Sequence, residues 1–182
     1  MPAPPQGLES FVATWWPGFS HRIHALHWPD VLLLAALLVL IRASSRLGMW
    51  AYALAAWPGT FAHESTHFLV AWLLRAQPAF PVLLPRRTEH GWRLGSVSFR
   101  AGRLRSLPIA LAPLLLAPLA VLWALWLLPG AHGPLYVLQA WIAAALCSAC
   151  LPSRTDLRVA LPGSLFLAAV ALLAGLIWLA LK

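Results

Sequence analysis

The sequence predicts an all-α polytopic membrane protein with about five transmembrane helices and a short β-hairpin-like insert between the second and third. Hydrophobic residues make up 61% of the 182 residues and charged residues only 10%, whereas a soluble domain carries about 25% charged residues on average. Eleven tryptophans are present, and tryptophan favours the membrane–water interface. The apolar residues also fall into long runs separated by arginine-containing segments. The length suits a single membrane-embedded domain over residues 1–182.

Five apolar runs are candidate transmembrane spans. They cover residues 29–41, 47–74, 107–128, 135–151 and 164–181. The first is expected to begin near Ile23, because a bilayer requires about 20 residues of helix. Pro58-Gly59 interrupts the second run, and three prolines at 108, 113 and 118 predict kinks in the third. Membrane helices tolerate such prolines where neighbouring groups satisfy the freed carbonyls.

The segments outside these runs have distinct characters. Residues 1–28 predict an interfacial segment without a signal peptide, since Met1–Gly7 lacks both positive charge and an apolar core. Residues 77–106 predict a cytoplasmic hairpin-like insert, because Trp92 to Arg100 alternates between two faces. An irregular loop is the alternative for this insert.

The basic residues predict the orientation. Ten arginines fall on the side of the membrane that holds the N-terminus and the insert, while the other side receives Arg42, Arg46 and Lys182. Positive residues stay cytoplasmic, so the N-terminus is expected inside, in a bacterial inner (plasma) membrane. The net charge of +8 therefore reflects topology, and no nucleic-acid partner is expected.

A candidate zinc site lies within the second run, at His63-Glu64-Ser65-Thr66-His67. Histidines four apart share one face of a helix and can bind one zinc ion. Glu64 lies beside them, where it can act as a general base toward water. Placing a carboxylate inside an apolar span costs several kcal/mol, so an ionisable group there usually indicates a functional site. The alternative is a set of polar residues that hold helices together.

Asp156 is the expected third ligand, because catalytic zinc usually takes three protein ligands. Glu89 lies in an arginine-rich turn, where it is expected to be solvated. His90 lies in the same turn and is a weaker candidate. His132 is also weaker, because it is expected on the opposite side of the membrane. Pairing of Asp156 with a neighbouring arginine is the alternative. Two further patterns, His21-x-x-His24-x-x-His27 and Cys147-x-x-Cys150, fit an interfacial helix and helix packing better than metal sites.

The stretch from Pro58-Gly59 to His67, the hairpin-like segment and the later Pro152–Asp156 together resemble the site-2 protease family of intramembrane zinc metalloproteases, over about residues 47–161. The second motif departs from the family pattern Asn-x-x-Pro-x-x-x-Leu-Asp-Gly: Ala149 stands at the Asn position, Asp156 comes one residue early and Leu157 replaces the Gly. The chain therefore resembles a core-only or divergent member.

The resemblance implies a zinc-dependent endopeptidase that hydrolyses a peptide bond in or near a transmembrane helix of a membrane protein. The exposed edge of the insert predicts a strand that holds the unwound substrate, through Val97, Ser98 and Phe99. The alternatives are a membrane-embedded zinc hydrolase of a non-protein substrate, a catalytically inactive metal-binding scaffold, and a metal transporter. The third and fifth runs contain no acidic residue or histidine, which disfavours the transporter.

Overall fold

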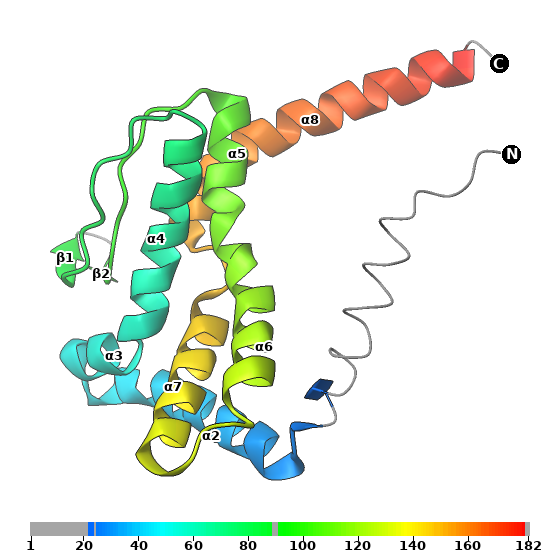
Figure 1. The fold of residues 1–182 in the computed structure, drawn as a ribbon. Coiled ribbons are helices and arrows are strands. Elements are labelled where there is room, and N and C mark those ends of the chain that lie inside the picture. Colours follow the sequence, from blue (N-terminus) through cyan, green and yellow to red (C-terminus); the bar gives the residue numbers. More distant parts are fainter. Residues whose placement is uncertain (1–21, 24, 89–90, 181–182) are drawn as a thin grey trace, which may run out of the picture.

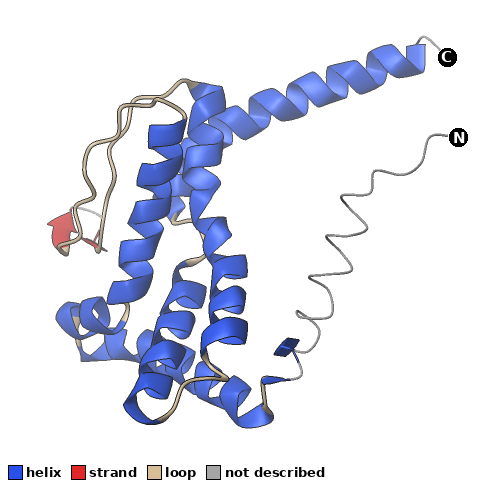
Figure 2. Cartoon of the chain, viewed as in Figure 1, coloured by secondary structure: helices blue, strands red, loops and turns tan. Residues whose placement is uncertain are grey.

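The computed structural model describes residues 22–23, 25–88 and 91–180, and these residues are mostly helical with one small two-stranded sheet (Figures 1 and 2). The elements follow one another along the chain in this order: α2 (Trp28–Ser44), η1 (Ser45–Leu47), α3 (Met49–Ala55), α4 (Trp57–Leu73), β1 (Arg86–Thr88), β2 (Gly91–Arg93), α5 (Arg103–Leu111), η2 (Ala112–Leu115), α6 (Leu116–Leu127), α7 (Gly133–Ala149) and α8 (Arg154–Ala180). Each of the five predicted apolar runs is therefore helical, with altered boundaries.

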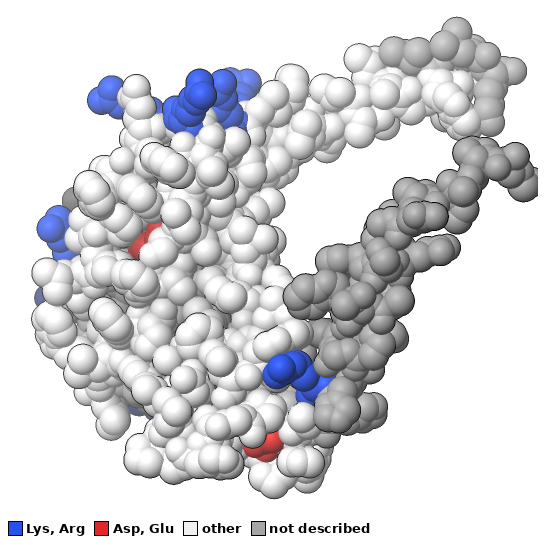
Figure 3. Space-filling view, in the orientation of Figure 1, with Lys and Arg blue, Asp and Glu red and all other residues white. Residues whose placement is uncertain are grey.

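Two helical segments are long and apolar enough to cross a membrane. They are the continuous α5–η2–α6 run, Arg103–Leu127, and the first part of α8, Arg154–Gly175. α7 is also apolar but shorter. Large apolar side chains are exposed on every long helix, and Figure 3 shows one face almost free of charge, with basic residues gathered above the start of α5.

The boundaries differ from the sequence expectation in three places. The second run breaks at Ala56, between α3 and α4, while Pro58 and Gly59 lie in the first turn of α4. Proline fits there because a first-turn N–H has no helical partner. In the third run the interruption is a 3₁₀ turn, η2, around Pro113. The last helix begins at Arg154, ten residues early, and Figure 1 shows it extending away from the bundle rather than returning along it.

Small residues let the helices pack closely. Ala124 on α6 packs with Ala140 and Ala143 on α7, and Ala144 and Ala145 on α7 pack against α2 and the start of α4. Small residues at helix interfaces allow the backbones to approach, which is the usual basis of helix association in lipid. Two side-chain hydrogen bonds also join α7 to its neighbours. Trp141 Nε1 donates to the Ala55 carbonyl of α3 (2.8 Å), and the Tyr136 hydroxyl donates to Asp30 of α2.

The insert folds as a long hairpin that lies along α4 (Figure 1). Arg86 pairs with Arg93 at the antiparallel β1–β2 strands. Further from the tip, Val82 and Ser96 exchange both backbone hydrogen bonds, and the Ala79 N–H donates to the Ser98 carbonyl. The predicted hairpin is thus present, but it is longer and less regular than expected. The first arm of the hairpin, residues 76–88, contains Pro78, Pro81 and Pro85. Proline has no N–H to donate to a β-ladder.

Candidate metal centre

Helix α4 presents His63 and His67 on one face. Their imidazole Nε2 atoms lie 3.2 Å apart, as the spacing of four residues predicts. His67 and the intervening Glu64 are buried, and His63 is half-buried. The Thr66 hydroxyl donates to the His63 carbonyl (2.7 Å), so its polar group is satisfied within the helix.

Glycine 59 brings α4 against α7. A Cβ atom at this position would lie only 2.2 Å from the Ala145 carbonyl oxygen and 3.0 Å from the Ala149 Cβ. Only glycine therefore permits this approach. One turn after Gly59, His63 Nδ1 lies 2.8 Å from the Ala149 carbonyl oxygen at the end of α7.

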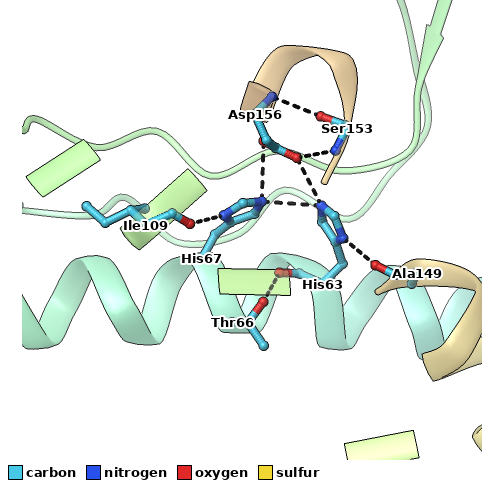
Figure 4. Close-up of polar contacts among 7 residues, drawn as sticks. All are labelled: His63, Thr66, His67, Ile109, Ala149, Ser153 and Asp156. Atoms are coloured by element: carbon cyan, nitrogen blue, oxygen red, sulfur yellow. Dashed lines mark hydrogen bonds and ion pairs between the residues drawn. The ribbon is translucent and has the colours of Figure 1, made fainter. Parts of the chain in front are cut away.

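Asp156 reaches the same point from the first turn of α8. Its carboxylate accepts a hydrogen bond from the Ser153 backbone N–H (2.7 Å), and the Ser153 hydroxyl accepts one from the Asp156 N–H (3.2 Å). This reciprocal pair is a capping box. The capping box starts α8 and also fixes the position of the Asp156 carboxylate. Asp156 Oδ2 lies 3.4 Å from His63 Nε2, and Oδ1 lies 3.4 Å from His67 Nε2 (Figure 4).

The tautomers of the two histidines follow from their outer contacts. His63 Nδ1 faces the Ala149 carbonyl, and His67 Nδ1 lies 2.7 Å from the Ile109 carbonyl. A carbonyl oxygen can only accept, so each Nδ1 carries a hydrogen, and in the neutral form each ring directs an Nε2 lone pair inward. Two such lone pairs and a carboxylate converge on one point, an arrangement that suits a cation.

A metal ion fits this donor set. The three side chains offer ligand atoms that all lie within 4.8 Å of one another. Two atoms bound to one tetrahedral zinc at about 2.0–2.1 Å lie about 3.3 Å apart, close to the 3.2 Å and 3.4 Å separations observed. The carbonyls on Nδ1 are the outer contacts that metal-binding histidines usually make. His63, His67 and Asp156 could therefore hold a metal ion.

The second arm of the hairpin, residues 91–100, lies against Glu64. A Cβ atom at Gly95 would lie 2.7 Å from the Glu64 Oε1 atom, so a side chain at residue 95 would displace the Glu64 carboxylate from this position. The arm also forms one wall of a cavity of about 980 Å³ that contains the three ligands and Glu64. Val97 and Phe99 line this cavity; Ser98 is not among its lining residues in the described part of the chain.

The remaining candidate residues lie elsewhere. His132 is the N-cap of α7, at the opposite end of that helix from Ala149. Cys147 and Cys150 are free thiols at the C-terminal end of α7. Four positions lie outside the described residues: His21, His24, Glu89 and His90. The described part of the chain therefore brings only Asp156, of the proposed third ligands, to the two histidines.

Several residues of the site were not identified from the sequence. Gly59 and Gly95 act through close approach, and Ile109 and Ala149 act through their backbone carbonyls. Ser153 did have a local signal, because Ser153-x-x-Asp156 matches the capping-box pattern that marks a helix start. The glycines had none, since their partners are distant in sequence.

No family model matches the chain, and no curated protein or solved structure is significantly similar to it. The assignment of a function therefore depends on the residues of the site and their geometry.

Proposed function

We propose that this chain is a zinc-dependent intramembrane endopeptidase, a core-only or divergent relative of the site-2 protease family. The observation that supports this most is the convergence of His63, His67 and Asp156 on one point, with the Glu64 carboxylate beside them in the same cavity. Two histidines, a carboxylate ligand and an adjacent glutamate are the parts that hydrolysis by a zinc peptidase requires.

Each of these residues has a separate role in the proposed reaction. His63, His67 and Asp156 hold the zinc ion, which when bound supplies Lewis acidity to the scissile carbonyl and to a water molecule. Glu64 accepts a proton from the attacking water and then donates it to the departing amide nitrogen. The hairpin arm packs on Glu64 at Gly95, and the Glu64 side chain is buried there.

The free edge of the hairpin is the proposed site for the substrate backbone. The backbone N–H and C=O of Ser96 and the C=O of Ser98 form hydrogen bonds with the first arm of the hairpin. In an extended strand, the backbone groups of Val97 and Phe99 therefore point to the opposite, unpaired edge. Both residues line the cavity. A substrate helix must unwind before cleavage, and this edge can replace the hydrogen bonds that it loses. Ser98 is proposed only to support the hairpin, through its carbonyl, which accepts the Ala79 N–H.

The edge role predicts an effect of proline at Val97. In the part of the chain that the structure describes, no backbone hydrogen bond joins Val97 to the facing arm, so Val97→Pro should preserve the hairpin. It removes one donor from the free edge, and cleavage should fall about tenfold with zinc content unchanged. Val97→Ala is the matched control, because it shortens the side chain and keeps the N–H. Equal cleavage by both variants would contradict the edge role.

The proposed protein crosses the membrane several times, with its N-terminus in the cytoplasm. Two helices are long and apolar enough to span it, and the remaining apolar helices pack against the same bundle. Arg105 and His132 lie near opposite ends of the α5–α6 run, and both are exposed.

Cysteine labelling tests this orientation. In a Cys147→Ser/Cys150→Ser background, a cysteine at Arg105 should react with an impermeant reagent only from the cytoplasmic side. A cysteine at His132 should react only from the outside. Reaction of both from one side would exclude a transmembrane α5–α6 run.

The proposed activity itself is tested in the membrane proteome. Cells carrying the wild-type chain should contain shortened fragments of at least one membrane protein, cut in or near a transmembrane helix, that are missing from cells carrying Glu64→Gln. Identical fragment sets in the two strains would contradict an endopeptidase.

A further inference from the structure

The ring of His67 is oriented by a backbone carbonyl that lies in another helix. Its Nδ1 atom lies 2.7 Å from the Ile109 carbonyl oxygen, a buried contact between α4 and the last turn of α5 (Figure 4). Ile109 is fully buried and packs with Ala71 on α4. The contact fixes which nitrogen of His67 carries the hydrogen, and so directs Nε2 toward His63 and Asp156.

A carbonyl in the middle of a helix normally accepts the N–H of the residue four positions later. For Ile109 that residue is Pro113, which has no N–H. The chain instead turns into the 3₁₀ segment η2, and the Ala112 N–H donates to Ile109. A carbonyl oxygen has two lone pairs, so the second remains available to His67. In an unbroken α-helix this carbonyl would instead point along the helix axis toward the N–H of residue 113.

We propose that Pro113 is a positioning residue for the metal site: by withholding an N–H, it turns the chain into η2, where the Ile109 carbonyl accepts the Ala112 N–H and still reaches His67 to orient its ring. This inference rests on the proposed zinc site and adds a residue to it. Pro113 touches neither metal nor substrate in this role; it acts only through Ile109 and His67. The 3₁₀ segment η2 thus belongs to the surroundings that orient the ligands of the proposed metal centre.

Pro118 provides a matched control. It lies five residues further along the same helical run, in the first turn of α6, and it also lacks an N–H. The carbonyl four positions before it belongs to Leu114, whereas the carbonyl that contacts His67 belongs to Ile109. Pro118→Ala therefore makes the same backbone change as Pro113→Ala away from the metal ligands, at an exposed rather than a buried position.

The test compares Zn²⁺ affinity and the Co²⁺ absorption spectrum of the purified full chain for wild type, Pro113→Ala and Pro118→Ala. We expect Pro113→Ala to weaken Zn²⁺ binding about 10–100-fold, the usual effect of losing an outer-shell partner. Its Co²⁺ ligand-field bands should shift, because the His67 ring is no longer held in place. Pro118→Ala should match wild type in both measurements.

Each other result would overturn the inference. Unchanged affinity and spectrum in Pro113→Ala would show that the carbonyl does not depend on the proline, and equal losses in both variants would indicate a general effect of helix kinks. An unfolded metal-free Pro113→Ala protein would also contradict it, because the loss of affinity would then come from the lost packing of this fully buried side chain and not from the His67 ring. If wild type itself binds no Zn²⁺, the proposed function fails instead.

Discussion

Glu64→Gln should lower turnover by orders of magnitude and leave the zinc of the proposed site in place. Glu64 is buried beside the ligands but is not one of the three residues that converge on the metal position. Glutamine has nearly the same shape, so the fold and the contact with Gly95 should persist, but its amide cannot accept the proton of the attacking water. Loss of a general acid–base group lowers rates by about 10²–10⁴-fold. The measurements are the cleavage rate of a purified membrane-protein substrate and the metal content of the same preparation.

Ser65→Ala is the control for the Glu64 variant. It changes the next residue of α4, outside the ligand set, and should retain both zinc and activity. A Glu64→Gln protein that cleaves at the wild-type rate would disprove the proposed mechanism. A variant that loses zinc as well would instead mean that Glu64 helps to hold the metal.

Asp156→Asn should remove most of the zinc. The carboxylate approaches both histidine Nε2 atoms at 3.4 Å, and in the proposed site its negative charge would hold the cation beside the two imidazole rings. The asparagine side-chain oxygen can still accept the Ser153 N–H, so the start of α8 should survive. The affinity should fall by more than the roughly 10–100-fold that follows loss of an outer-shell partner. Competition with a chelator of known zinc affinity measures the change.

Asp30→Asn is a matched control for this loss of charge. Asp30 occupies the same helical position in α2 as Asp156 does in α8, and it also accepts a backbone N–H at 2.7 Å, from His27. It bonds Tyr136 rather than a metal ligand. Normal zinc affinity in Asp30→Asn with weak affinity in Asp156→Asn is the expected pair of results; equal affinities would remove Asp156 from the ligand set.

Much of the helical layout could be predicted from the sequence because apolar runs are a local property. All five runs are helical, and the alternation after Trp92 predicted a hairpin. The ends of helices were predicted less well. The last helix begins at Arg154 because of its capping box with Asp156, a signal of four residues that hydrophobicity does not reveal. The path of α8 away from the bundle was likewise not predicted.

The sequence by itself determined that His63, Glu64 and His67 share one turn of an apolar helix, because residues three and four apart are neighbours whatever surrounds them. The choice of Asp156 came from the scarcity of acidic residues. Only the tertiary structure brought Asp156 to the histidines, laid Gly95 on Glu64, and paired each imidazole with its carbonyl. These contacts join residues about 30 to 90 positions apart, so helix packing decides them, and no local pattern in the chain encodes which groups will meet.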